Sequence, residues 1–169
     1  MTRVALIHYS STGNVHALAE ALADGAEEAG AEVRLRRVAE LAPQEAIEAN
    51  PAWRAHADAT AGIPEATHDD LRWADAFAFG TPARYGNVSA QLKQFLDTTA
   101  PLWAAGELAD KPVTAFAEAG GNPYGTAHAS GDGAPGPEVL AAASEQGRRL
   151  VRVAALLSSG VWPLAGDPR

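Results

Sequence analysis

The chain has 169 residues, 47% of them apolar, which is enough for one domain with a sizeable core. A net charge of -8 and a pI near 5.0 exclude the strongly basic classes, so we expect neither a nucleic acid nor an anionic membrane as a partner. The absence of cysteine excludes disulfides, thiolate metal sites and thiol catalysis.

A predicted strand over residues 4–7 leads into a polar loop and then a helix. The apolar run is too short for a signal peptide or a membrane span, so we expect a cytoplasmic protein. Amides at the helix start, together with the hydroxyls of Ser10-Ser11-Thr12-Gly13-Asn14, can hold a phosphate; the alternative is an ordinary Ser/Thr helix cap. The loop lacks the Lys of nucleoside-triphosphate loops and the Gly-x-Gly-x-x-Gly of dinucleotide sites. The monophosphate of FMN suits it best.

A second strand is predicted over residues 31–38, where Val33 and Leu35 alternate with arginines. The connection that follows, residues 39–70, is long enough to be functional or mobile, and it has a possible short helix at residues 44–49. Trp53 in this connection either covers a ligand or anchors the loop to the core.

The remaining elements alternate in type. Strands are predicted over residues 76–79 and 113–117, with a glycine-bearing loop over residues 80–87 and a helix ending near Thr99 between them. A last helix is predicted over residues 137–157. This alternation predicts a doubly wound parallel α/β sheet, with residues 1–169 forming one domain and residues 158–169 a flexible tail.

Four motifs resemble one known family. They are Ser10-Ser11-Thr12-Gly13-Asn14, the segment Gly80-Thr81-Pro82-Ala83-Arg84-Tyr85-Gly86-Asn87-Val88-Ser89, Leu102-Trp103 followed by Gly106, and Gly121-Asn122-Pro123-Tyr124-Gly125. Together they resemble the WrbA-type NAD(P)H:quinone oxidoreductases, which have a flavodoxin-like fold. The resemblance implies an FMN-dependent enzyme that moves two electrons from NADH or NADPH to a quinone and assembles as a dimer or tetramer.

The resemblance also implies the residues of the site. The phosphate loop would use Ser10, Ser11, Thr12, Gly13, Asn14 and Val15; the flavin ring would lie along Pro82, Ala83, Arg84, Tyr85, Gly86 and Asn87; Glu118 and Gly120 would close the site, and Trp103 would lie beside the nicotinamide or quinone. No side chain is expected to act as a catalytic residue, because the chemistry takes place on the flavin. No metal is expected, because the five histidines have no metal-like spacing.

One departure from the family stands out. The fourth strand joins the Gly121 to Gly125 motif directly, with a seam near residues 118–119, so a helix and the fifth strand of the family are missing. We therefore expect the strand order 2-1-3-4, with residues 113–117 forming an apolar, unpaired edge. His128 is a candidate to replace a family histidine lost with that segment.

Two other functions are considered. A flavodoxin-type electron carrier would bind FMN with little NAD(P)H activity, but Trp103 and the Arg84-Tyr85-Gly86-Asn87 motif disfavour it. A phosphoacceptor signalling domain on the same sheet would need acidic residues after the first strand and at the end of the third. His8, Tyr9 and Ser10 stand at the first of these places, so we set it aside.

Overall fold

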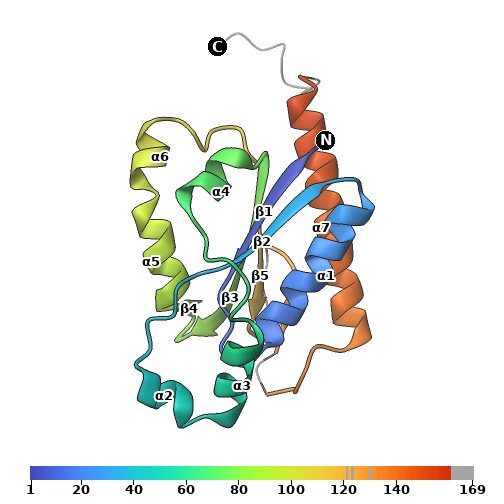
Figure 1. Cartoon of the computed structure of the whole chain (residues 1–169). Coiled ribbons are helices and arrows are strands. Elements are labelled where there is room, and N and C mark those ends of the chain that lie inside the picture. The colour runs from blue at the N-terminus through green and yellow to red at the C-terminus, as the bar shows by residue number, and fades with distance from the viewer. Residues whose placement is uncertain (121, 123, 130, 161–169) are drawn as a thin grey trace.

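The computed structural model describes residues 1–120, 122, 124–129 and 131–160. Its main sheet is parallel, in the order β2-β1-β3-β5-β6. The strands are β1 (Arg3–His8), β2 (Glu32–Arg37), β3 (Ala76–Arg84), β5 (Val113–Glu118) and the two-residue β6 (Ala127–His128). The flavodoxin-like α/β class predicted from the sequence is confirmed, and so is the 2-1-3-4 order of the four long strands (Figure 1).

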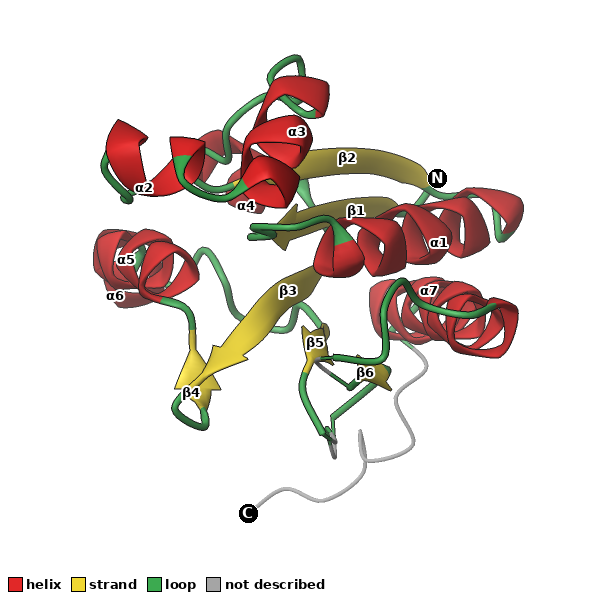
Figure 2. Ribbon diagram, turned by 90° about the horizontal axis from the view of Figure 1, so that it is seen from below, coloured by secondary structure: helices red, strands yellow, loops and turns green. Residues whose placement is uncertain are grey.

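Helices cover both faces of this sheet (Figure 2). α1 (Asn14–Glu28) and α7 (Pro137–Ser158) pack on one face, against Val4, Leu6 and Phe116. α4 (His68–Trp73), α5 (Ala90–Thr98) and α6 (Ala100–Ala104) pack on the other, where Ala5 and Ile7 point. Because alternate residues of β1 enter different cores, the strand is buried on both sides, as a central parallel strand should be.

α1 and α7 cross at two glycines. A Cβ on Gly25 would overlap the carbonyl oxygen of Ser144, and a Cβ on Gly147 would overlap that of Leu22. The helices can approach this closely because neither glycine has a side chain. α7 thereby fixes α1, and with it the loop that precedes α1, against the sheet.

The long connection after β2 contains two helices, α2 (Gln44–Glu48) and α3 (Pro51–Ala59). The short helix expected at residues 44–49 is confirmed, but the second helix was not predicted. Asn50 caps α3 by accepting hydrogen bonds from the amides of Ala52 and Trp53, and Pro51 occupies its first position. In Figure 1, α3 lies beside the first turn of α1.

The expected unpaired edge is wrong at the end of β5. Ala117 pairs with Ala127, and Glu118 pairs with His128, so β6 occupies the fifth position of the sheet. Farther back along β5, Gln146 of α7 donates to Thr114 Oγ1 and to the carbonyl oxygen of Ala115, both at 2.8 Å. A short strand and one amide side chain thus take the place of the longer strand that the family resemblance implied.

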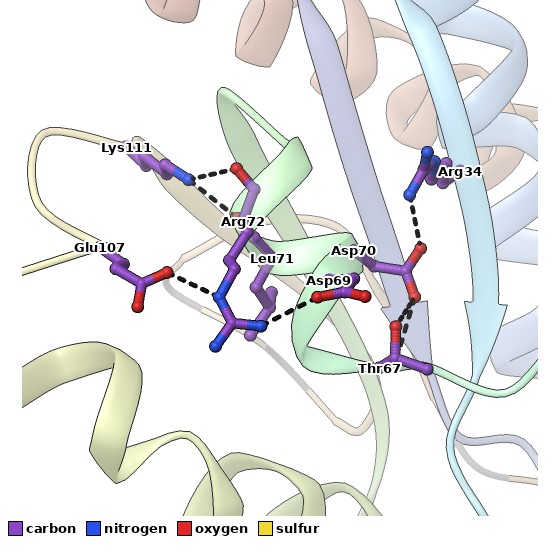
Figure 3. A network of polar contacts seen from close by, with 8 residues as sticks. All are labelled: Arg34, Thr67, Asp69, Asp70, Leu71, Arg72, Glu107 and Lys111. Carbon is purple, nitrogen blue, oxygen red and sulfur yellow. Dashed lines mark hydrogen bonds and ion pairs between the residues drawn. The ribbon is translucent and has the colours of Figure 1, made fainter. Parts of the chain in front are cut away.

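A polar network holds α4 in place (Figure 3). The buried carboxylate of Asp70 accepts hydrogen bonds from Arg34 at 3.2 Å, from Arg36 at 3.0 Å, and from the amide and hydroxyl of Thr67. Burial alone would raise the pKa of Asp70, but the Thr67 donors and the two arginines outweigh burial and hold it below its ordinary value. At the other end of α4, Lys111 donates to the carbonyl oxygens of Leu71 and Arg72.

No helix in the described ranges is both long and apolar enough to cross a membrane.

Candidate functional site

The loop between β1 and α1 has an open helix start at its centre. Gly13 is the N-cap of α1 with φ of +106°, which favours glycine, and α1 has no side-chain cap. The amide of Gly13 donates to Ser10 Oγ at 3.1 Å, which curls the loop back on itself. The helix therefore begins with first-turn amides directed into the loop, a geometry that attracts an anion.

Gly13 lies next to His56 of α3. A Cβ at this position would lie 3.6 Å from Nδ1 of His56 on α3, an ordinary contact distance. The backbone angle, rather than the space around Gly13, thus requires glycine.

Two further strand ends are joined to this loop by side-chain hydrogen bonds. Arg84 at the end of β3 donates from Nη2 to Ser11 Oγ at 3.3 Å. Asn14 donates from Nδ2 to Glu118 Oε1, at the end of β5, at 2.9 Å. Residues more than seventy positions apart therefore meet at the carboxyl edge of the sheet, where open α/β folds bind ligands. Gly120 follows two residues after Glu118.

The segment predicted as a loop along a flavin ring is a hairpin. β3 continues to Arg84 and pairs with β4 (Asn87–Val88) in antiparallel fashion, which leaves Tyr85 and Gly86 as a two-residue turn. Both turn residues have positive φ, as a type I′ turn requires. Pro82 is buried at the root of this hairpin, whereas the Tyr85 side chain is fully exposed at its tip.

Trp103 is not brought to these loops within one chain. It lies on α6 with 77% of its surface exposed, and Figure 1 places α6 at the other end of the sheet from the β3–β4 hairpin. His128 lies next to Glu118 in the sheet, but it is buried and its Nε2 donates to the carbonyl oxygen of Gly133 at 2.8 Å. Gly121 and Pro123 of the fourth motif lie outside the described residues.

A cavity of about 170 Å³ lies behind the loop between β1 and α1, under α3. It is lined by His8, Tyr9, Ser10, Glu40, Trp53 and His56, among others. The sequence did not reveal it, because its walls come from β1, the long connection and α3. Trp53 takes the anchoring role that the sequence allowed for, since its Nε1 donates to Glu40 Oε2 at 3.2 Å.

Glu40 accepts hydrogen bonds from several residues around this cavity. Its carboxylate also accepts from Tyr9 Oη at 2.8 Å and from Gln91 Nε2 of α5 at 2.9 Å. Burial would raise the pKa of Glu40, but the amide of Ala42 and the Gln91 and Tyr9 donors outweigh burial and lower it. A charged Glu40 thus ties the end of β1 to α3 and to α5, which are the elements around the loop.

Three of the histidines form a row that sequence spacing did not suggest. His8 ends β1, His16 lies in α1, and His56 lies on α3. His8 Nε2 and His16 Nδ1 are 3.0 Å apart and hydrogen-bonded, and the rings of His16 and His56 are 5.4 Å apart. Across the described ranges, no group of three or more His, Asp or Glu side chains has a geometry that could hold a metal ion.

Residues 2–132 match the family described as NADPH-dependent FMN reductase. The chain belongs to this family. The match includes Ser11, Arg84 and Glu118, so the loop cluster lies within the part of the chain that matches the family.

Several relatives of this FMN reductase-family chain are named "NAD(P)H dehydrogenase (quinone)". One from Deinococcus radiodurans is 44% identical over 117 residues, which are 69% of this chain and 58% of the relative. One from Chelativorans is 46% identical over 114 residues, which are 68% of this chain and 55% of the relative. The matched part of the chain therefore spans little more than half the length of each of these relatives.

A third relative with the same name, from Geotalea uraniireducens, is 34% identical over 202 aligned positions that cover 92% of this chain and 99% of the relative. Since this alignment is longer than the 169 residues of the chain, it passes over a stretch of the relative that the chain lacks. This agrees with the missing segment inferred from the motifs.

Solved structures support the fold. A WrbA-like flavodoxin protein from Agrobacterium tumefaciens has a TM-score of 0.66 at 21% identity, covering 92% of this chain and 98% of that one. An archaeal flavodoxin has a TM-score of 0.55 at 18% identity, covering 93% and 99%. At these identities the likeness concerns the fold alone.

Proposed function

We propose that the chain binds FMN and transfers two electrons from NADH or NADPH to a quinone. The observation that carries the proposal is the joining of three strand ends around one open helix start, through Arg84 to Ser11 and Asn14 to Glu118. Family membership and the names of the relatives support the same chemistry. Bound FMN would supply reversible hydride acceptance, which no side chain provides.

The loop fits a flavin phosphate. The first-turn amides of α1 and the hydroxyls of Ser10, Ser11 and Thr12 provide donors, and no side chain caps the helix in their place. Residues 10–15 would hold the phosphate, and Pro82, Ala83, Arg84, Tyr85, Gly86 and Asn87 would lie along the ring.

Charged residues around the site would tune it. Arg84 would place a positive charge close to the loop, where it favours an anion. Glu118 would place a negative charge on the opposite wall, and we expect it to weaken FMN binding and disfavour the reduced flavin. Gly120 would leave room beside Glu118.

The proposal also covers the domain organisation, the location and the assembly of the protein. We propose that residues 1–169 act as one domain with a flexible tail over 158–169, and that the protein is cytoplasmic, with no nucleic-acid or membrane partner, as the net charge of -8 favours. We further propose a homo-oligomer, dimer or tetramer. The exposed Tyr85 and Trp103 support it, because Trp103 could reach a flavin site only from another copy of the chain.

The test is a flavin titration of the purified protein. Quenching of FMN fluorescence should saturate at one FMN per chain, and Arg84→Gln should weaken binding because it removes the cation at Ser11. Arg54→Gln, a change at an exposed arginine on α3 that pairs with Asp58, serves as a matched control. Equal affinity of the Arg84 variant and wild type, or no quenching by wild type, would contradict the proposal.

A further inference from the structure

The row of histidines reaches the rim of the phosphate loop through His56. Nδ1 of His56 lies on the side of Gly13 where a Cβ would stand, at a distance of 3.6 Å from that position. Along the part of the chain that the structure describes, the His56 ring has no hydrogen-bond partner, whereas the rings of His8 and His16 bond to each other. His56 therefore presents an open imidazole nitrogen to the loop.

The buried ring of His8 is held neutral. His16 Nε2 lies 3.3 Å from Glu20 Oε1, so that its Nδ1 is free to accept from His8 Nε2. His8 is 98% buried and its Nδ1 has no partner; burial, reinforced by His16, lowers the pKa of His8 to about 3, against the opposing carbonyl of Arg36.

His56 is under a weaker constraint. Burial, and then the neighbouring His16, lower the pKa of His56, so that it is neutral at pH 7 in the free chain. It is only half-buried, however, and its ring is not committed to another group. An incoming negative charge can therefore protonate His56 at less cost than the fully buried His8.

The fixed side-chain charges around the loop offer a phosphate no net positive charge, which a protonated His56 would supply. Arg84 contributes one positive charge at Ser11, but Glu118 contributes one negative charge at Asn14. The groups that face His56 across the cavity and from α1 are His8, His16, Tyr9, Arg37 and Glu40. Arg37 is paired with Glu65, so it supplies no free positive charge to the loop. Glu40 keeps its negative charge, because Tyr9 and Gln91, which donate to it, are neutral. A phosphate dianion thus meets a loop whose fixed side-chain charges nearly cancel.

We propose that His56 is a phosphate-recognition residue that takes up a proton from solvent at Nδ1 when a phosphate monoester enters the loop, so that the chain prefers phosphorylated to unphosphorylated flavin more strongly as the pH falls. This inference rests on the proposed function, because it assigns the phosphate of FMN to that loop. The sign follows from linkage. An anion favours the charged imidazole, so binding is accompanied by proton uptake and strengthens as the pH falls from above the bound-state pKa of His56 toward its free-state value.

The experiment compares FMN with riboflavin, which lacks the phosphate, between about pH 6 and pH 8, where histidine titrates. Wild type, His56→Gln and a control, His68→Gln on α4, whose ring bonds Thr98, would be titrated. The phosphate of FMN itself titrates near pH 6, but it does so equally with every variant, so the difference between variants isolates the protein. Calorimetry in buffers of different ionisation enthalpy counts the protons taken up by wild type without relying on any variant.

In wild type and His68→Gln, the ratio of FMN affinity to riboflavin affinity should rise as the pH falls, by up to about tenfold per pH unit more than in His56→Gln. FMN binding by wild type should take up as much as about one proton. The same slope and proton uptake in wild type and His56→Gln would overturn the role of His56 while leaving FMN binding intact. Failure of wild type to bind FMN at any pH would instead overturn the proposed function, and this inference with it.

Discussion

Replacing Gly147 by Ala should destabilise the chain, although alanine is normally the better helix former. Gly147 lies in the interior of α7, where alanine gains about 1 kcal/mol over glycine in an exposed helix. Here the new Cβ would overlap the Leu22 carbonyl oxygen and lie 3.0 Å from the Ala26 amide nitrogen. Both are backbone atoms of α1, so the helices must separate, and overpacking of this kind costs about 3 kcal/mol. The net loss is about 2 kcal/mol in the free energy of unfolding.

Urea unfolding followed by circular dichroism measures this change directly. A thermal scan should show a midpoint lower by about 4–8 °C for a chain of this size. Gly62→Ala is the matched control, because a Cβ at Gly62 would meet no atom within 4 Å and should change stability by less than about 0.5 kcal/mol. A Gly147 variant as stable as wild type, or more stable, would refute the close α1–α7 crossing on which the placement of the loop depends.

Three further changes test other parts of the structure. Asp70→Asn should lose about 2 kcal/mol at pH 7. Because the folded-state pKa of Asp70 is lowered, this deficit should shrink in urea titrations as the pH falls through that pKa, and a deficit constant with pH would contradict it. Trp53→Phe keeps a ring but loses the bond to Glu40, so it should cost about 1 kcal/mol by the same unfolding assay; no loss would argue against the anchor. Gly13→Ala forces a side chain to a φ of +106°, so it should cost about 1–2 kcal/mol and weaken FMN binding, and unchanged stability and affinity would disprove the strained cap.

The fold was largely predictable from local patterns. β1 and the first half of β3 are buried apolar runs, β5 is a mostly apolar run around the buried Phe116, and α1 and α7 have apolar residues at helical spacing. Each element is therefore visible in its own segment. Helix α3 was overlooked although Asn50 and Pro51 are ordinary start signals, because the alanine-rich segment after them has no buried stripe. β6 has only two residues, too few for any periodic pattern.

The candidate site was only partly predictable from the sequence, and there is a physical reason why some of its contacts were missed. Strand ends of a parallel sheet meet at one edge, so the proximity of Ser11, Arg84 and Glu118 followed from topology. The contact of His8 with His16 depends on how α1 packs beside the end of β1, and that of His16 with His56 on how α3 lies beside α1. Spacing along the chain does not encode either. The paired edge at Glu118 was missed because the family's fifth strand is missing here and the two residues of β6 that pair instead have no recognisable strand pattern.

The central claim is that this chain holds a flavin that accepts electrons from a nicotinamide cofactor and passes them to a quinone. The most direct measurement mixes the FMN-loaded protein with NADH or NADPH without oxygen, follows the visible flavin absorption, and then adds benzoquinone. We expect the absorption to bleach with NAD(P)H and to return with benzoquinone. If dithionite bleaches the bound flavin but neither NADH nor NADPH does, the chain is an electron carrier, and the proposed quinone reductase activity is wrong.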